Sequence, residues 1–246
     1  MKFALLGYGK MGLEIEKLAI EKGHEIVLTI DQPEEWETGL SDLKGADVAI
    51  DFSTPDSVAD NIHFCFDSGI PIVVGTTGWH QLIDEIRTEC LDRGQSLFWA
   101  PNFSIGVNIF FELNRKLASL MSDWSDYDIS LEETHHLHKL DAPSGTAIVL
   151  ANDIIHHHSR KEKWVKVMTE NPGDLRIRSN RIEEVTGSHK VVYESNEDQI
   201  EIIHTAKNRR GFALGAILAA EWLVGKRGFF EMRDLLDSPA LRGPII

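Results

Sequence analysis

The sequence contains little cysteine. Two cysteines, Cys65 and Cys90, occur in 246 residues, and each falls within a predicted helix. Small disulfide-stapled scaffolds are thereby excluded, because they need several closely spaced cysteine pairs. Unpaired thiols in an otherwise ordinary composition are typical of a reducing compartment, and we predict a cytoplasmic protein.

The sequence also lacks a long hydrophobic run. The longest apolar stretch, from Phe212 to Val224, is interrupted by Glu221 and is shorter than the ~20 residues that a membrane-spanning helix needs. No basic and apolar leader precedes the first predicted strand, which begins at Lys2. We therefore expect no membrane partner.

Positive charge is in short supply as well. Lys and Arg number 25 against 39 Asp and Glu, which gives a formal net charge of -14. Because binding to nucleic acid relies on clustered cationic side chains, we expect no nucleic-acid partner. A dense basic group at Lys207, Arg209 and Arg210 is the exception. It either holds an anionic substrate or a cofactor phosphate, or it forms a solvated turn.

The N-terminal part contains a dinucleotide-binding pattern. An apolar run at residues 3–6 leads into a glycine-rich turn, a helical pattern follows, and a second apolar run at residues 26–30 ends on Asp31. The glycines allow the backbone to approach a pyrophosphate, and Asp31 is placed to accept hydrogen bonds from a ribose. The alternative is a glycine-rich turn that binds no cofactor. The turn reads Gly7-Tyr8-Gly9-Lys10-Met11-Gly12.

Strands and helices keep alternating up to about residue 103. Apolar runs at 48–53, 72–74 and 97–99 are typical of buried parallel strands, and helical patterns lie between them. In such a sheet, ligands bind beyond the carboxyl ends of the strands. Two segments that follow strands are therefore expected to face the cofactor, although either could be an ordinary loop. They are Gly75, Thr76 and Thr77, and Ala100, Pro101, Asn102 and Phe103.

The second half of the chain has a different pattern. A long helix is predicted over residues 104–122, and helical patterns over 212–225 and 230–236 return to the first domain. We predict an α/β protein with a Rossmann-type dinucleotide-binding domain from residues 1–106 and 213–246. An α+β substrate domain from residues 107–212 is expected to contain an open mixed sheet. Its strand-like runs lie at 127–131, 164–169, 175–178, 190–194 and 200–205.

The stretch from Glu133 to Ala147, ETHHLHKLDAPSGTA, contains the candidate catalytic residues. A strand pattern leads into His135 and Lys139, and a Pro-Ser-Gly-Thr turn then opens a helix. An imidazole or an ammonium group supplies the proton that accompanies hydride transfer to an unsaturated carbon or imine. The helix N-terminus favours an anion. The candidates for holding the carboxylates of a substrate are Gly145 and Thr146 for one group and His136 for part of another.

A metal site is the competing interpretation of this stretch. His135, His136 and His138 are three potential ligands, but neighbouring residues on a strand point to opposite faces. At most His136 and His138 therefore share a side. No second group of ligands is spaced to complete the site, and we predict no bound metal.

Together these motifs resemble the dihydrodipicolinate reductase (4-hydroxy-tetrahydrodipicolinate reductase) family over nearly the whole chain. The resemblance implies an enzyme that reduces 4-hydroxy-tetrahydrodipicolinate to tetrahydrodipicolinate with a nicotinamide cofactor and loss of water, in diaminopimelate and lysine biosynthesis. It also implies a homotetramer assembled through the sheet of the second domain. Besides the central stretch and the glycine-rich turn, the matching segments are Asp51-Phe52-Ser53-x-Pro55, Gly75-Thr76-Thr77-Gly78, Pro101-Asn102-Phe103-Ser104-x-Gly106-Val107-Asn108 and Phe229-Phe230-Glu231-Met232.

The resemblance also implies roles for individual residues. His135 would be a proton donor and acceptor, Lys139 a proton donor, and Arg209 matches the arginine of the family's His-x-Ala-x-x-Arg segment. The dicarboxylate would be bound by His136, Gly145 and Thr146, with Arg209 assigned to the same substrate. The nicotinamide cofactor would be lined by Gly7 to Gly12, Asp31, Gly75 to Thr77 and Ala100 to Phe103.

One departure from the family's pattern concerns the cofactor. The residues after Asp31 are Gln32-Pro33-Glu34-Glu35, without the arginine that often follows the acidic residue. A ribose 2′-phosphate would meet carboxylates there, so we expect NADH to be preferred over NADPH, although Lys10 offsets part of the repulsion.

Two other functions compete with a reductase. A non-enzymatic dinucleotide sensor would share the first domain but would not need His135 and Lys139 beside an anion-binding turn. A metal-dependent hydrolase would use the histidines as ligands, and chelators would abolish its activity.

Overall fold

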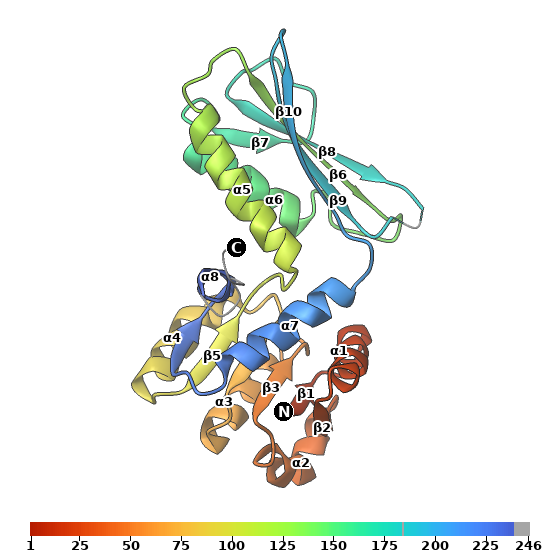
Figure 1. Cartoon of the computed structure of the whole chain (residues 1–246), viewed down its shortest axis with the longest axis vertical. Coiled ribbons are helices and arrows are strands. Elements are labelled where there is room, and N and C mark those ends of the chain that lie inside the picture. Colours follow the sequence, from red (N-terminus) through yellow and green to blue (C-terminus); the bar gives the residue numbers. More distant parts are fainter. Residues whose placement is uncertain (184, 239–246) are drawn as a thin grey trace, which may run out of the picture. The chain divides into compact units, whose positions relative to one another are not determined.

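The computed structural model describes residues 1–183 and 185–238, which form two compact units (Figure 1). The first comprises Met1–Ile105 and Arg209–Ile246, and the second comprises Gly106–Asn208. The prediction had placed Gly106 in the first domain and residues 209–212 in the second. The difference arises because each boundary falls where a helix begins, α5 at Ile105 and α7 at Arg210. The last predicted residues of the first domain, 239–246, lie outside the described part.

The first unit is built on a parallel sheet with the order β11-β5-β4-β3-β1-β2. The chain leaves β1 toward one edge to make β2 and then returns to the other side of β1 to make β3. The strand order therefore reverses between β1 and β3, where the carboxyl ends of the strands open a crevice. The strands are β1 (Lys2–Leu6), β2 (Glu25–Ile30), β3 (Val48–Asp51), β4 (Ile72–Val74), β5 (Ser96–Trp99) and β11 (Gly228–Phe230).

Strand β11 corrects one prediction. Residues 230–236 were expected to be helical, but Phe229 and Phe230 pair with β5 before helix α8 (Met232–Asp237) begins. A three-residue strand is too short to show a period of two, so the sequence pattern did not distinguish it from the start of the helix.

Helices cover both faces of this sheet. One face packs against α1 (Lys10–Glu21), α7 (Arg210–Leu223) and α8. The other packs against α2 (Trp36–Leu43), α3 (Val58–Ser68) and α4 (Ile83–Asp92). Successive strand residues alternate between the two cores, which explains why these strands read as continuous apolar runs. Short 3₁₀ turns, Pro33–Glu35 and His80–Leu82, precede α2 and α4.

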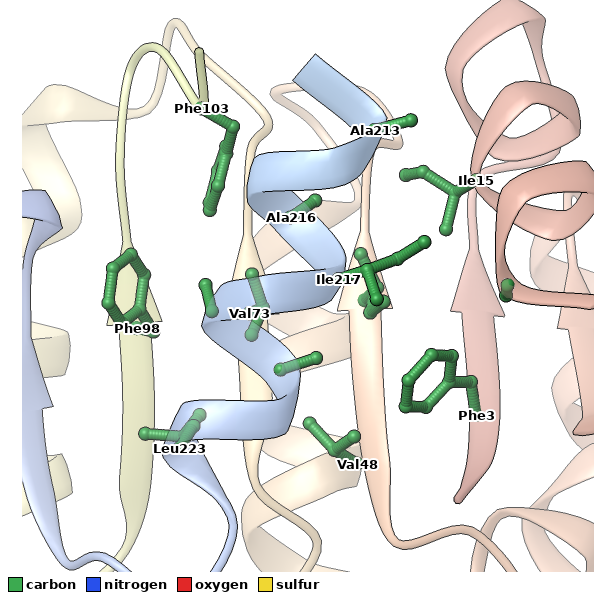
Figure 2. Packing of buried hydrophobic residues seen from close by; sticks show 14 of the residues in the cluster. Phe3, Ile15, Val48, Val73, Phe98, Phe103, Ala213, Ala216, Ile217 and Leu223 are labelled. Atoms are coloured by element: carbon green, nitrogen blue, oxygen red, sulfur yellow. The ribbon is translucent and has the colours of Figure 1, made fainter. Parts of the chain in front are cut away.

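Helix α7 packs closely against the sheet because its inner face is made of small residues. Figure 2 shows Ala213, Ala216 and Ile217 of α7 beside the strands that contribute Phe3, Val48, Val73 and Phe98. Gly215 lies against the turn after β5, where a Cβ would be 1.7 Å from the carbonyl oxygen of Phe103. The absence of side-chain atoms at this position permits the close contact.

The second unit contains a mixed sheet, as predicted. Its order is β10-β9-β6-β8-β7, in which β6 runs parallel to β8 and antiparallel to β9. Helices α5 (Ile105–Met121) and α6 (Gly145–His157) pack on one face over Ile129, Leu131, Ile177 and Tyr193 (Figure 1). The strands are β6 (Asp128–His135), β7 (Lys163–Val165), β8 (Asp174–Arg181), β9 (Ser188–Glu194) and β10 (Gln199–Thr205). Within the described ranges, every helix falls short of the length and apolarity required to cross a membrane.

The contact between α7 and Phe103 predicts a stability difference between two glycine-to-alanine variants. Gly215→Ala should destabilise the protein by about 1–3 kcal/mol, because the new methyl group overlaps a backbone carbonyl that cannot move without disturbing the core. Gly211→Ala, at the start of the same helix, meets nothing within 4 Å and should leave stability nearly unchanged. Denaturant unfolding of the two variants checks this, and equal stabilities would contradict it.

Candidate active site

The glycine-rich turn lies at the crevice of the first unit. Gly7 follows β1 with φ +87°, and a Cβ there would be 2.4 Å from the carbonyl oxygen of Phe52. At Gly12 a Cβ would be 2.4 Å from the carbonyl oxygen of Gly7, so the third glycine lets α1 start directly over the turn. Gly9 has nothing within 4 Å of its Cβ position, which leaves its backbone open to a ligand. These are the three roles that a dinucleotide fingerprint requires of its glycines.

Asp31 lies where the fingerprint predicts an acid, directly after β2. Its Oδ1 accepts a hydrogen bond from the backbone N–H of Tyr8 at 2.8 Å, which ties the acid to the glycine-rich turn. The side-chain amide of Gln32 donates to Oδ2 at 3.2 Å. The carboxylate is therefore held at the crevice and remains exposed to solvent.

A cavity of about 480 Å³ opens beside Asp31, within the size range of small-molecule sites. Trp36 forms part of its wall and packs against Phe64 with ring centroids 4.5 Å apart. The cavity therefore combines an aromatic wall with the acid and the glycines of the fingerprint. Its lining is Gly7, Gly9, Ile30, Asp31, Gln32, Pro33, Trp36, Phe52, Ser53, Thr54, Ser57, Asp60, Asn61 and Phe64.

A buried carboxyl group connects the end of β3 to the loop after β4, next to this crevice. Asp51, at the end of β3, is fully buried and accepts hydrogen bonds from Thr76 at 2.5 Å and from Asn61 at 2.8 Å. Asn61 in turn accepts a hydrogen bond from the Trp36 indole at 3.0 Å. Burial raises the pKa of Asp51, and the bonds from Thr76, Asn61 and Ser53 oppose that rise. Thr76 thus fixes the loop after β4 through its side chain.

The other residues predicted to line the cofactor differ in burial and in the contacts of their side chains. Ala100 and Phe103 are buried in the core, so their side chains hold the turn after β5 and only their backbone can meet a ligand. The Cβ position of Gly75 is occupied by the Phe52 ring. Met11 packs partly against the core. Thr77, Lys10 and Pro101 are exposed, the side chain of Asn102 accepts a hydrogen bond from the Ser104 N–H, and the Tyr8 hydroxyl donates to Glu16.

The central stretch of the second unit contains a buried acid and imidazole pair. Glu133 and His135 lie two residues apart on β6 and therefore point to the same side. Glu133 is fully buried, and its Oε2 lies 2.6 Å from Nδ1 of His135. Burial alone would raise the pKa of Glu133, but hydrogen bonds from His135, Ser179 and Ser144 outweigh it and hold that pKa well below its usual range. Glu133 therefore carries a full negative charge beside His135.

Arg181 is a residue of this site that the sequence did not reveal. It lies opposite His135 in the register of β6 with β8, and its Nη1 and Nη2 each lie 3.1 Å from Oε1 of Glu133. The same guanidinium donates to the carbonyl oxygens of Lys139 and Asp141, at 3.3 and 2.6 Å. The predicted strand ended at residue 178, so no local pattern pointed to Arg181.

Lys139 lies in the loop after β6. Its Nζ is 2.8 Å from Oδ1 of Asp141, and its backbone N–H donates to the carbonyl of His136. Burial would raise the pKa of Asp141, but the hydrogen bond and charge of Lys139 outweigh it and lower that pKa. His136 is half-buried, and its ring centroid lies 6.2 Å from that of His138.

The predicted anion seat is the N-terminus of α6. Ser144 is the N-cap, and its Oγ accepts the backbone N–H of Ala147 at 3.2 Å. Gly145 and Thr146 are the first two helical residues, whose N–H groups have no acceptor within a helix. Gly145 is exposed and has nothing within 4 Å of its Cβ position, so an anion can approach this end of the helix.

His189 is a third buried residue of this site, beside Glu133 and His135, and the sequence did not reveal it. It comes from β9, and its Nε2 is 3.0 Å from Oγ of Ser144. Burial, reinforced by the nearby His135, lowers the pKa of His189 to about 3. Glu133, His135 and His189 offer ligand atoms within 4.8 Å of one another, a combination different from the one considered in the sequence. The Arg181 guanidinium opposes a cation there, and the absence of a metal stays a prediction.

The basic group near residue 207 is divided between the two units. Lys207 belongs to the second unit, whereas Arg209 is the exposed N-cap of α7 in the first. Arg210 forms an ion pair with Glu21 of α1, at 2.5 Å. The structure therefore gives Arg210 a role in the first unit and leaves the partner of Arg209 a prediction.

The glycine-rich turn and Asp31 at the switch point of a parallel sheet are typical of a dinucleotide-binding domain, and together with the family matches they place the chain among the pyridine-nucleotide-dependent oxidoreductases. Family models for the N-terminus and the C-terminus of dihydrodipicolinate reductase match residues 1–103 and 106–236. The chain therefore belongs to the dihydrodipicolinate reductase family.

Individual relatives agree with this assignment. The chain is 48% identical over 237 residues to 4-hydroxy-tetrahydrodipicolinate reductase from Christiangramia forsetii, covering 96% of this chain and 98% of that protein. It is 37% identical over 249 residues to the enzyme of the same name from Staphylococcus aureus, covering 96% of this chain and 100% of the relative.

Solved structures share the fold. A dipicolinate-bound dihydrodipicolinate reductase from Paenisporosarcina sp. TG-14 superposes with a TM-score of 0.74 at 22% identity, covering 94% of this chain and 97% of that one. An amine dehydrogenase from Mycobacterium smegmatis has a TM-score of 0.58 at 10% identity, with 94% of each chain covered.

The burial of His189 predicts an acid-dependent loss of stability. Because its folded pKa lies below the unfolded value, the unfolded chain binds an extra proton as the pH falls below about 6.5, and the folded state is disfavoured by about 2 kcal/mol at pH 5. In His189→Asn the drop in unfolding free energy between pH 7 and pH 5 should be smaller by that amount. Urea unfolding at both pH values measures it. His156→Asn removes an exposed imidazole from α6 and is the control, and an unchanged drop in His189→Asn would refute the expectation.

Proposed function

We propose that this chain is a 4-hydroxy-tetrahydrodipicolinate reductase. It reduces 4-hydroxy-2,3,4,5-tetrahydrodipicolinate to 2,3,4,5-tetrahydrodipicolinate with NADH or NADPH and loss of water, in diaminopimelate and lysine biosynthesis. The observation that carries the proposal is the buried Glu133–His135 pair on β6, followed in the chain by Lys139 and the exposed N-terminus of α6. Membership of the reductase family supports the same reaction.

The residues divide the chemistry between proton transfer and binding. The nicotinamide, when bound, supplies the hydride. Lys139, whose Nζ is held 2.8 Å from Asp141, donates the proton that accompanies the hydride. His135 exchanges a proton with the substrate, and the Glu133 carboxylate, 2.6 Å from its Nδ1, orients the imidazole. One hydride and one proton are added, and the 4-hydroxyl group leaves with a proton as water.

The substrate is a dicarboxylate, and the N-terminus of α6 is suited to one of its carboxylates. The N–H groups of Gly145 and Thr146 and the helix dipole bind this group, while His136 holds part of the other. Arg209 is assigned to the same substrate. A solved relative contains bound dipicolinate, an aromatic dicarboxylate, which supports this class of ligand.

The cofactor is expected to be NADH in preference to NADPH. Oε2 of Glu35 accepts the backbone N–H groups of Asp31 and Gln32 at 2.6 and 3.0 Å. These two bonds lower the pKa of Glu35, which stays ionised. An ionised carboxylate is thus held by the backbone directly after β2, where it repels a 2′-phosphate, and the exposed Lys10 offsets only part of the repulsion.

The residues proposed to line the cofactor come from four segments of the first unit. The cavity beside Asp31 supports the placement of its adenosine half. The segments are Gly7, Tyr8, Gly9, Lys10, Met11 and Gly12, then Asp31, then Gly75, Thr76 and Thr77, and finally Ala100, Pro101, Asn102 and Phe103. A homotetramer and a cytoplasmic location complete the proposal, and both rest on the resemblance to the family and on the composition.

The reaction is tested by following NADH oxidation while a dihydrodipicolinate synthase generates the unstable substrate from pyruvate and aspartate semialdehyde. The wild type should oxidise NADH only when the synthase is active, and Lys139→Ala should lower kcat by roughly 10²- to 10⁴-fold, because the proton donor is lost. NADH binding, measured by fluorescence, should survive. Lys116→Ala, which removes an exposed lysine of α5, controls for the loss of a positive charge.

The same assay separates the competing functions. A sensor would bind NADH but show no synthase-dependent oxidation, and a metal-dependent hydrolase would lose its activity in a chelator. Turnover that persists in a chelator and vanishes in Lys139→Ala leaves the reductase.

Cofactor preference is tested at Glu35. Glu35→Gln keeps a hydrogen-bond acceptor near the two N–H groups but removes the charge, so kcat/KM for NADPH relative to NADH should rise by roughly threefold to tenfold. Glu85→Gln is the matched control, since it removes an exposed carboxylate of α4 that lies outside the segment after Asp31. Equal efficiency of the wild type with both cofactors would argue against the preference, and an unchanged ratio in Glu35→Gln would argue against the role of this carboxylate.

A further inference from the structure

We propose that Glu133 and Arg181 are positioning residues that hold both proton-transfer groups of the site through one ionic network. Glu133 orients the imidazole of His135, and Arg181 connects Glu133 to the loop that carries Lys139. The inference rests on the proposed function, because it concerns how that reaction's two proton-transfer residues are held.

Arg181 is bound on every side of its guanidinium. Nη1 donates to Oε1 of Glu133 at 3.1 Å and to the carbonyl of Asn180 at 2.8 Å. Nη2 donates to the same Oε1 at 3.1 Å and to the carbonyl of Asp141 at 2.6 Å, while Nε donates to the carbonyl of Lys139 at 3.3 Å. Three nitrogens thus reach four oxygens. A lysine ammonium, which is a point charge, cannot reproduce this fork.

Two of these bonds connect Arg181 to carbonyl groups of the loop that carries Lys139. The two carbonyl groups belong to Lys139 and Asp141, the residues whose side chains form an ion pair with Nζ and Oδ1 2.8 Å apart. By binding both carbonyls, Arg181 fixes the backbone at each end of the segment that presents the ammonium group. The loop after β6 therefore depends for its shape on a side chain from β8.

Glu133 connects Arg181 to the imidazole of His135. Its Oε1 is used by Arg181 and its Oε2 by His135, and the whole side chain is buried. At 2.6 Å the lone pair of an unprotonated Nδ1 would repel an ionised carboxylate oxygen, so Nδ1 of His135 carries a proton. The proton that His135 exchanges is then the one on Nε2.

The glycine next to Nε2 leaves room beside this nitrogen. Gly187, with φ +154°, lies so close that a Cβ would be 3.0 Å from Nε2 of His135. A side chain at this position would cover the nitrogen that the carboxylate has left for proton exchange. His189 packs edge-on against His135 with ring centroids 5.0 Å apart, which limits rotation of the imidazole.

The test compares Glu133→Gln, Arg181→Lys and Arg181→Ala in the coupled assay, with Arg115→Gln as the control. Arg115 pairs with Asp153 between α5 and α6 at 2.8 Å, in the same unit. Glu133→Gln should lower kcat by roughly 10- to 100-fold with an unchanged KM for NADH, because the imidazole loses its orientation. Arg181→Lys should lose as much kcat as Arg181→Ala. If only the charge of Arg181 mattered, the lysine would restore kcat.

A second measurement reads the imidazole directly. Solid-state ¹⁵N NMR of protein labelled at histidine, with a His135→Asn sample to identify the resonances, should show the Nδ1–H tautomer for neutral His135 in the wild type. In Glu133→Gln this single tautomer should be replaced by a mixture. The Nε2–H tautomer in the wild type, or wild-type kcat in Glu133→Gln, would overturn the inference.

The two kinds of failure are distinguishable. If the wild type shows no synthase-dependent oxidation, the proposed function fails, and the NMR measurement still decides how Glu133 holds His135. If the wild type turns over and both Glu133→Gln and Arg181→Lys retain full kcat, the function stands and the positioning role is wrong. Should Arg181→Ala fail to fold, the isosteric Glu133→Gln variant and the wild-type spectrum decide the question.

Discussion

The negative charge of a carboxylate without access to water has to be balanced by hydrogen-bond donors and positive charges nearby. Glu133 imposes this requirement on the second unit. The compensation comes from several segments: an imidazole on the same strand, a guanidinium from β8, and hydroxyl groups from Ser144 and Ser179. Because an unpaired buried charge costs several kcal/mol, these segments are stable only in the arrangement that satisfies the acid. The loop after β6 and the N-terminus of α6 are therefore placed by the same constraint that places His135.

The first unit solves a related problem with neutral partners. Asp51 is as buried as Glu133, but it is surrounded by the amide of Asn61 and the hydroxyl groups of Thr76 and Ser53. Burial raises the pKa of Asp51, whereas the pKa of Glu133 is lowered. One acid joins the ends of strands beneath the cofactor crevice, and the other holds a charge beside a proton-transfer residue. The partners contribute to this difference, because Asp51 has neutral donors around it whereas Glu133 lies beside an imidazole and a guanidinium.

Much of this architecture could be predicted from local patterns, while the contacts that complete the site could not. The strand, glycine turn, helix and acid from residue 3 to Asp31 are close in sequence, so their spacing alone predicts the crevice. The shared face of Glu133 and His135 also follows from the period of a strand. Arg181 reaches Glu133 across 48 positions through the register of β6 with β8, and no periodicity encodes such a pairing. Strand β11 was missed for a similar reason, because three residues at a sheet edge show no pattern of their own.

The close packing of α7 has a consequence for the order in which the protein folds during synthesis. Ala213, Ala216 and Ile217 cover a core whose strands β1 to β5 lie in the first 105 residues, so the part of that sheet face that α1 does not cover lacks its helix while the second unit is being made. Residues 106–208 are continuous and contain all five strands of their own sheet, so they have what they need to fold before α7 arrives. The N-terminal residues are thus translated first and finish folding last.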